Sequence, residues 1–225
     1  MSYHKTCEMS LDLCKRAFKP DKRERRHCAI TAGNVSKLLN VHPYTSCHKL
    51  LWVKLETGNA SPKNTNQKRG IELEDEALKM YAKATNRTIV LKDSFIRHEK
   101  YSYLIAQVDA VTACGHVVEI KCPQKVRNYI PEHHKIQMQV TMEVCGIEQM
   151  CYVQYVRGHA LNVKIVSRER DSFASMLCQI REFAALLFGL VKKKHANKEL
   201  EGVFTDTQEL PGSYMCPCAI KNVIK

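Results

Sequence analysis

The segment Asp109–Lys121, read as DAVTACGHVVEIK, limits what this chain can fold into more than any other segment does. Its two halves are apolar and strand-like, and the Cys114-Gly115 pair between them suits a turn. The sequence therefore predicts a β-hairpin with strands over Tyr103–Val111 and Val117–Cys122.

Two carboxylates and one amine are expected to meet on a single face of this hairpin. Side chains alternate between the faces of a strand, so Glu119 and Lys121 point the same way. If the chain turns at Cys114, Asp109 lies opposite Glu119 on that face. Such carboxylates hold Mg²⁺ or Mn²⁺ and leave room for water and phosphate, while the lysine orients the water or stabilises phosphate charge. An ordinary amphipathic hairpin, in which these three side chains are solvated or salt-bridged, has the same spacing. Other residues must therefore decide between a metal site and an ordinary hairpin.

The segment Gln67–Ala84 supplies a further acid. Its residues follow a helical period after Gly70, and Leu78 and Tyr81 come four and seven positions after Glu74. Glu74 is thus predicted on the inward stripe, where a carboxylate is costly unless it is paired or bound to metal. The alternative is a glutamate at the helix edge. The residues predicted mainly on the outer side are Glu72, Glu76, Lys79 and Lys83.

Five short motifs occur along the chain in the order RHCAITA, RGIELE, VDA, EIKCP and QMQV. In that order they resemble the lambda-type (viral recombinase, YqaJ-like) exonuclease branch of the PD-(D/E)xK nuclease superfamily. The resemblance extends over residues Arg23–Tyr155, and a Cys-Pro pair directly after the catalytic lysine is common in this branch. It implies a restriction-endonuclease-like α/β fold, in which helices flank a mixed central β-sheet.

The resemblance assigns roles to the hairpin residues. Asp109 and Glu119 become the principal metal ligands, the Ile120 backbone carbonyl becomes a third ligand, and Lys121 becomes the catalytic lysine. The implied cofactor is Mg²⁺, for which Mn²⁺ would substitute.

Two predicted helices complete the implied site. Glu74 takes the place of the helix-borne acid near the metals. Gln137, on a helix predicted over Lys135–Val144, takes the glutamine position, where an amide orients water or phosphate. Gln139 is the less favoured substitute for Gln137.

The resemblance also indicates where a DNA end would bind. Arg26 falls where the family has an arginine that receives the 5′-phosphate in some members, and a guanidinium suits that role because it contacts phosphate oxygens in pairs. The family's pattern often has a phosphate-binding serine at the position of Gly33. Thr31 or Asn34 would compensate for its absence.

The composition supports an anionic partner. The net charge is +12 and the isoelectric point is about 9.2, which is typical of a DNA-binding chain whose affinity falls with salt. Lys125 and Arg127, just past the hairpin, are the stronger candidates for holding the DNA backbone; most other basic residues are as well explained by a solvated face. His133 and His134 are expected in an exposed loop.

A single nuclease domain is expected over residues 1–210, with a basic helical region (1–57), a catalytic core (67–166), a covering helix (170–195) and a tail (211–225). The cysteines are odd in number and scattered, which predicts reduced thiols, and no metal role is favoured for the close pair Cys216 and Cys218. The sequence shows no signal peptide and no apolar run of membrane-spanning length, so we expect an intracellular protein without a membrane partner.

Together these features predict an Mg²⁺-dependent deoxyribonuclease. The resemblance implies 5′→3′ digestion of one strand of linear double-stranded DNA, leaving 3′ single-stranded overhangs for recombination or replication processing. It also implies a ring-shaped homotrimer and a single-strand annealing protein as partner. The alternatives are a structure-specific DNA endonuclease of the same fold and a non-catalytic DNA-binding recombination scaffold.

Overall fold

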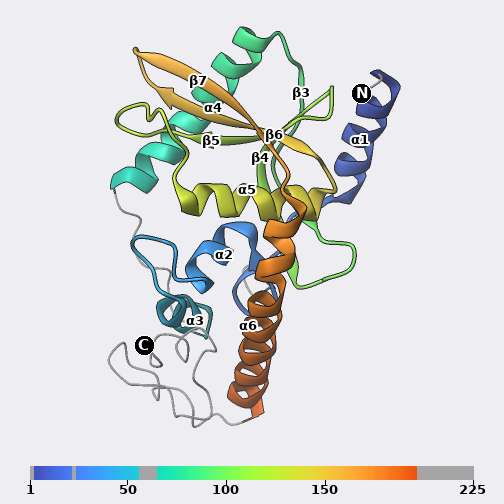
Figure 1. Ribbon diagram of the computed structural model, residues 1–225, viewed down its shortest axis with the longest axis vertical. Coiled ribbons are helices and arrows are strands. Elements are labelled where there is room, and N and C mark those ends of the chain that lie inside the picture. Colours follow the sequence, from blue (N-terminus) through green and yellow to red (C-terminus); the bar gives the residue numbers. More distant parts are fainter. Residues whose placement is uncertain (1–2, 22–23, 56–64, 197–225) are drawn as a thin grey trace.

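A mixed β-sheet lies at the centre of the structure, with helices on both of its faces (Figure 1). The computed structural model describes residues 3–21, 24–55 and 65–196, without the side chains of residues 3–7, 25, 26 and 194–196. The helices are α1 (Tyr3–Arg16), the π-helical turn η1 (Glu24–Cys28), α2 (Ala32–Leu38), α3 (Cys47–Leu55), α4 (Thr65–Thr85), α5 (Glu132–Cys145) and α6 (Arg170–Ala196). The strands are β1 (Ala17–Phe18), β2 (Ile30–Thr31), β3 (Ile89–Arg97), β4 (Leu104–Thr112), β5 (Val117–Lys121), β6 (Gln149–Val156) and β7 (Ala160–Ser167).

The strand order is β1-β3-β4-β5-β6-β7, and the short β2 pairs with β4 beside this path. Neighbours along the path are antiparallel except β5 and β6, which are parallel. Parallel strands need a crossover connection, and α5 supplies it. The predicted hairpin is therefore β4 and β5, and it lies in the middle of the sheet.

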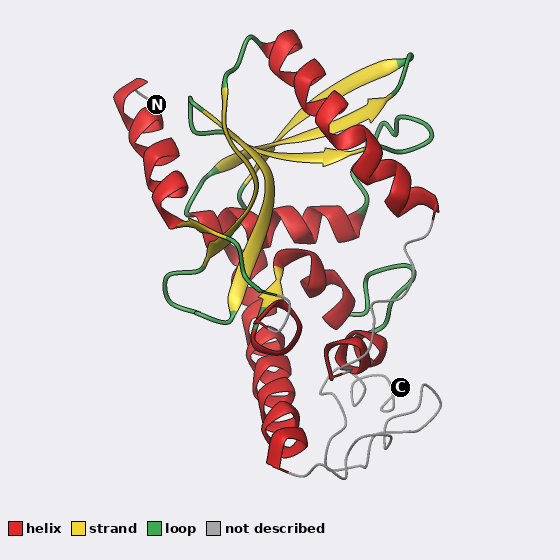
Figure 2. Ribbon diagram, turned by 180° about the vertical axis from the view of Figure 1, so that it is seen from behind, coloured by secondary structure: helices red, strands yellow, loops and turns green. Residues whose placement is uncertain are grey.

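Helices cover the two faces of the sheet unequally. Helices α2, α5 and α6 share the larger apolar core with one face, while α4 packs on the other face through Leu73, Ala77, Leu78 and Tyr81. Figures 1 and 2 show α4 crossing one face and α5 crossing the opposite one. Because α5 is buried nearly all round, its few polar residues that face the sheet must find partners there.

Three helices differ from the sequence-based expectation or qualify it. Helix α4 begins at Thr65, before the predicted start, so Gly70 lies inside the helix. Helix α6 matches the predicted covering helix, and a stripe that includes Phe173, Ile180 and Leu187 is buried in the core. Its residues Arg170–Lys193 are also long and apolar enough to span a membrane, but a core helix passes the same test. Half-buried His133 and His134 lie in the first turn of α5, so the exposed-loop expectation for them was wrong.

The predicted tail and the pair Cys216 and Cys218 lie outside the described residues. The division into an N-terminal region, a catalytic core and a covering helix stays a prediction.

Two glycines give a matched test of the backbone geometry. Gly146 ends α5 with a positive φ of 69°, and a Cβ there would meet nothing within 4 Å. We expect Gly146→Ala to lower the free energy of unfolding by about 1 kcal/mol through backbone strain alone. Gly189 is exposed inside α6 with equal space around it, so Gly189→Ala should raise the same quantity by roughly 0.5–1 kcal/mol. Urea unfolding of both variants measures the difference, and equal effects of the two changes would contradict the assigned helix ends.

Candidate active site

The site begins where β4 and β5 separate. The two strands pair only through Ala110 with Val118 and Val111 with Val117, while β2 pairs with the first residues of β4. Because β3 occupies the other edge of β4, the gap between β2 and β5 leaves the middle of this edge without a backbone partner. Asp109 lies in this gap. We call the region the strand fork.

A side chain replaces the missing backbone pairing at the strand fork. The backbone N–H of Ile120 donates a hydrogen bond to Asp109 Oδ2 at 2.6 Å. Buried amide groups require a partner, so the carboxylate joins the two strands where the ladder has ended. This contact fixes Asp109 next to the strand that carries Glu119 and Lys121.

Glu119 is the most deeply buried acid of the group, with 2% of its surface exposed. Its Oε1 accepts hydrogen bonds from Lys121 Nζ and from Gln137 Nε2, the latter at 2.8 Å. Among the described residues, no donor reaches the other carboxylate oxygen, Oε2. One oxygen of Glu119 is therefore held in place, and the other is available to a ligand.

The two predicted glutamine candidates lie on different sides of α5. Gln137 faces the strand fork, whereas Gln139 Nε2 donates to the Ser167 carbonyl at 3.0 Å and Gln139 Oε1 accepts from the Glu169 backbone N–H at 2.8 Å. Two residues apart on a helix is a rotation of about 200°. Gln139 therefore ties α5 to the end of β7, and the structure rules it out as the substitute for Gln137.

Glu74 approaches the fork from α4, which is anchored to the sheet by neighbouring side chains. Arg69 Nε donates to the Cys122 carbonyl at 3.2 Å, and Lys92 Nζ contacts Asp75 at 2.5 Å.

Glu76 adds a third anchor to α4. The Tyr155 hydroxyl donates to Glu76, and Arg157 Nε donates to its Oε2 at 2.8 Å. Glu76 was expected mainly on the outer side of the helix; its side chain is 38% exposed, but it also contacts the end of β6 and the turn after it. These anchors hold Glu74 half-buried, with its carboxylate close enough to feel the charge of Glu119.

The acids at the fork destabilise one another in their charged forms. Burial, followed by the charge of Glu119, raises the pKa of Asp109 well above its usual value. Burial also raises the pKa of Glu74, and the charges of Asp93 and Glu119 add to the effect. Burial alone would lower the pKa of Lys121, but Glu119 and Asp109 outweigh it, so the pKa is raised and the ammonium stays charged.

Three carboxylates therefore face one ammonium, and a cation is the natural counter-charge. The donor set fits a hard divalent ion such as Mg²⁺ or Mn²⁺, because it offers carboxylate oxygens without thiolate or imidazole ligands at the fork. In the described part of the chain, no three His, Cys, Asp or Glu side chains form a ready-made metal cluster. An ion held by Asp109, Glu119 and the Ile120 carbonyl would have only three protein ligands, so positions would remain for water or phosphate.

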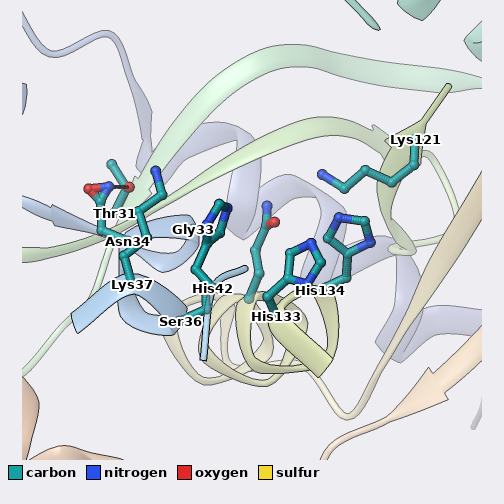
Figure 3. A pocket seen from close by; sticks show the side chains of 10 residues that line it. Thr31, Gly33, Asn34, Ser36, Lys37, His42, Lys121, His133 and His134 are labelled. Atoms are coloured by element: carbon teal, nitrogen blue, oxygen red, sulfur yellow. Dashed lines mark hydrogen bonds between the residues drawn. The ribbon is translucent and has the colours of Figure 1, made fainter. Parts of the chain in front are cut away.

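A cavity of 270 Å³ adjoins the fork (Figure 3). In Figure 3, Lys121 reaches toward it from one side, while Thr31, Asn34 and Lys37 gather on the other. Its lining residues are Thr31, Gly33, Asn34, Ser36, Lys37, His42, Lys121, His133, His134 and Gln137. No carboxylate is among them, and we call this space the donor-lined cavity.

Lys37, which sequence reasoning missed, is the unusual member of the cavity wall. It is half-buried, its pKa is lowered by desolvation, and no carboxylate or hydrogen-bond acceptor among the described residues contacts its ammonium group. Lys37 follows Asn34 by three positions on α2. This helical spacing is the sequence signal that could have placed both side chains on one face. An unpaired, partly desolvated cation indicates an anionic ligand.

The predicted phosphate-binding residues take different positions. Asn34 Nδ2 donates to Thr31 Oγ1 at 2.8 Å, so these two line the cavity as a pair. A Cβ at Gly33 would lie 3.8 Å from Gln137, which is ordinary contact. Arg26 lies in η1, and its side chain is outside the described residues.

The two predicted DNA-backbone residues lie in the loop after β5. Lys125 and Arg127 are exposed. Buried Gln154 accepts from the backbone N–H of Arg127 at 2.9 Å and donates to its carbonyl at 2.8 Å. Because Gln154 pairs with Lys121 in the sheet, this amide holds the loop beside the fork.

Comparisons with known proteins agree with the motif order. The sequence pattern of the YqaJ-like viral recombinase domain matches residues 22–148. Among solved structures, the alkaline exonuclease LHK-Exo from Laribacter hongkongensis has a TM-score of 0.65 and 22% identity, over 78% of this chain and 96% of that one. A complex of LHK-Exo with dAMP gives 0.63 and 21%, over 78% of this chain and 96% of that one.

A phage-related exonuclease from Haemophilus somnus gives a TM-score of 0.54 and 13% identity, over 78% of this chain and 99% of that one. A search of curated proteins found no significant match. The predicted PD-(D/E)xK-type fold is thereby confirmed, and the fold and the family pattern support a nuclease.

The repulsion among the acids gives a stability prediction. Asp109→Asn keeps an oxygen that can accept from Ile120 but removes a carboxyl group whose ionisation is opposed by burial and by Glu119. In EDTA we expect the variant to unfold with a free energy about 1 kcal/mol larger than the wild type, as is typical when a strained site is relieved. Urea unfolding measures it. A destabilised Asp109→Asn would contradict the claim that the fork concentrates unfavourable negative charge.

Proposed function

This chain belongs to the YqaJ-like viral recombinase domain family, and on that premise we propose that it is a divalent-metal-dependent deoxyribonuclease. The observation that carries the proposal is the convergence of Asp109, Glu119 and Lys121 at the strand fork, with Gln137 bonded to the same glutamate. Glu119, with 2% of its surface exposed, is more deeply buried than a salt-bridged surface residue would be, and a packing cluster would not hold an excess of carboxylates.

The chain's own residues have distinct tasks in the proposed hydrolysis. Asp109, Glu119 and the Ile120 carbonyl would hold a metal ion, and Glu74 adds negative charge from α4. When bound there, Mg²⁺ or Mn²⁺ would supply Lewis-acid polarisation of the phosphate and would lower the pKa of a water. Lys121 stays protonated and stabilises charge that develops on the phosphate.

Gln137 has a positioning task in this proposal. Its amide nitrogen donates to Glu119, its side chain lines the donor-lined cavity, and its amide oxygen would orient an attacking water there. Water attacks in line, and the scissile bond breaks to leave a 5′-phosphate and a 3′-hydroxyl.

The donor-lined cavity supports action at a DNA end. A terminal 5′-phosphate carries more negative charge than an internal phosphodiester and would satisfy the unpaired ammonium of Lys37. Thr31 and Asn34 add polar groups to the cavity wall. The family resemblance, and no observed contact, adds Arg26 to the proposed subsite. LHK-Exo, which has this fold, has been crystallised with dAMP, a nucleotide that carries such a phosphate.

The proposed reaction is 5′→3′ digestion of one strand of linear double-stranded DNA. Lys125 and Arg127 would hold the backbone beside the fork, and the product would be a 3′ single-stranded overhang for recombination or replication processing. A ring-shaped homotrimer, a single-strand annealing partner and an intracellular location belong to the same proposal and rest on the family resemblance.

Duplex DNA labelled separately at each 5′ or 3′ end tests the chemistry. With Mg²⁺ we expect the wild type to release the 5′ label, and Lys121→Ala and Asp109→Ala to fold but cleave at least about 10²-fold more slowly. The first variant loses the contact to the developing phosphate charge, and the second loses a metal ligand. Lys79→Ala removes an exposed lysine on α4 and serves as the control.

Three other outcomes would count against this reading. Full activity of either site variant would refute the site assignment. Cutting of closed circles would favour an endonuclease, and DNA binding without cleavage would favour a scaffold.

The ratio of cleavage rates on 5′-phosphorylated and 5′-hydroxyl ends tests the end-binding subsite. Lys37→Met should reduce this ratio by about tenfold, because a charge-assisted hydrogen bond is lost. Gly33→Ser should raise the ratio, because Gly33 lines the cavity, an added Cβ there makes only ordinary contact with Gln137, and the serine supplies a hydroxyl that can donate to phosphate. Lys49→Ala, an exposed lysine on α3, is the matched control, and an unchanged ratio in Lys37→Met would place the phosphate elsewhere.

A further inference from the structure

The loop between α2 and α3 exposes a tyrosine close to the donor-lined cavity. Tyr44 is 84% exposed, the highest value among the large hydrophobic residues that the structure describes. A single exposed aromatic residue is common on protein surfaces and implies nothing by itself. Tyr44 differs from such a residue because its loop is hydrogen-bonded and lies next to the donor-lined cavity.

Hydrogen bonds hold the loop in a defined conformation. The backbone N–H of His42 donates to the Ser36 carbonyl at 3.0 Å, and that of Cys47 donates to Asn40 Oδ1 at 2.8 Å. The backbone N–H of Tyr44 itself donates to His42 Nδ1 at 3.2 Å. The backbone that carries the tyrosine is thus fixed before any ligand arrives, which lowers the entropy lost on binding.

Aromatic rings lead from Tyr44 to the wall of the cavity. The ring centroids of Tyr44 and His42 are 6.0 Å apart, in an edge-on arrangement. His42 lies 5.2 Å from His133, and His133 lies 4.3 Å from His134. The three histidines line the donor-lined cavity, so the outermost ring of this row stands beside a space that suits a phosphate.

We propose that Tyr44, supported by His42, is a stacking platform for a nucleobase, namely that of the 5′-terminal nucleotide whose phosphate enters the donor-lined cavity. The inference rests on the proposed function and adds a base-binding site to it. A nucleotide has a charged phosphate and a flat, weakly polar base. The donor-lined cavity suits the phosphate, and the ring of Tyr44 suits the base. Stacking on an aromatic side chain accepts all four bases, as an end-digesting nuclease requires.

A fluorescent base reports stacking directly. The probe is a 5′-phosphorylated duplex with 2-aminopurine as its 5′-terminal base, mixed with the protein in EDTA so that no cleavage occurs. We expect the wild type and Tyr44→Phe to quench the fluorescence. Tyr44→Ala should lose the quench and bind about tenfold more weakly, which corresponds to about 1.4 kcal/mol.

Two controls separate the possible results. Ile165→Ala removes another exposed apolar side chain, from β7, and should behave as the wild type does. A second duplex carries 2-aminopurine at the 3′ end of the complementary strand. Equal quenching by Tyr44→Ala and the wild type overturns the proposal, and so does a Tyr44-dependent quench with the 3′ probe alone.

Cleavage of the same duplex in Mg²⁺, measured in parallel, tells the failure of this inference from the failure of the proposed function. Cleavage by the wild type together with an unaltered Tyr44→Ala overturns the stacking platform and leaves the nuclease intact. A Tyr44-dependent quench without any cleavage supports the platform and contradicts the nuclease. Circular dichroism of Tyr44→Ala should match that of the wild type, because the side chain is exposed.

Discussion

The contact between the Asp109 carboxylate and the Ile120 backbone N–H is the constraint on which the site depends. β4 is paired with β3 along its length, but its other edge is divided between β2 and β5. Where neither strand reaches, a side chain must satisfy the free amide, and a carboxylate does so. The residue that closes the gap is therefore also a charged group in a nearly dry place, beside a strand that carries a second acid.

The charges around the fork are separated by sign. Burial and neighbouring negative charge raise the pKa values of Asp109 and Glu74 at the fork, whereas the adjoining cavity has lysines, amides and uncharged histidines but no carboxylate. Burial, followed by nearby positive charge, lowers the pKa of His42 to about 4. Lys121 stands between the two regions, bonded to Glu119 and exposed to the cavity. A cation and a phosphate, placed side by side, would neutralise both regions at once, and this combination is what phosphodiester hydrolysis requires.

Local patterns predicted the hairpin well, because strand alternation and the turn at Cys114-Gly115 depend on neighbouring residues only. They placed Glu119 and Lys121 on one strand, and the family resemblance, together with a predicted helix, added Gln137 to them. The same reasoning could not choose between Gln137 and Gln139, since that choice depends on which way α5 faces the sheet. The segments that carry Glu74 and Gln137 were both correctly predicted to be helical. The residues that these helices contact in the fold could not be predicted from local patterns.

Residues whose partners come from distant segments were the ones missed. Glu76 contacts β6 and the turn after it, and no local pattern reports that contact. Lys37 and His42 come from α2 and the loop after it, which meet α5 and β5 only in the folded chain. Gly33, where the family's pattern often has a serine, indicated that the wall of the donor-lined cavity is unusual. Only the folded structure shows that the Lys37 ammonium has no acceptor among the described residues.

The central claim is that the strand fork holds a divalent metal for phosphodiester cleavage. Anomalous scattering from crystals grown with Mn²⁺ and a 5′-phosphorylated oligonucleotide tests it most directly. The account predicts an Mn²⁺ peak within ligand distance of Asp109, Glu119 and the Ile120 carbonyl. A peak only at other residues, or none at Mn²⁺ concentrations that support cleavage, would contradict it.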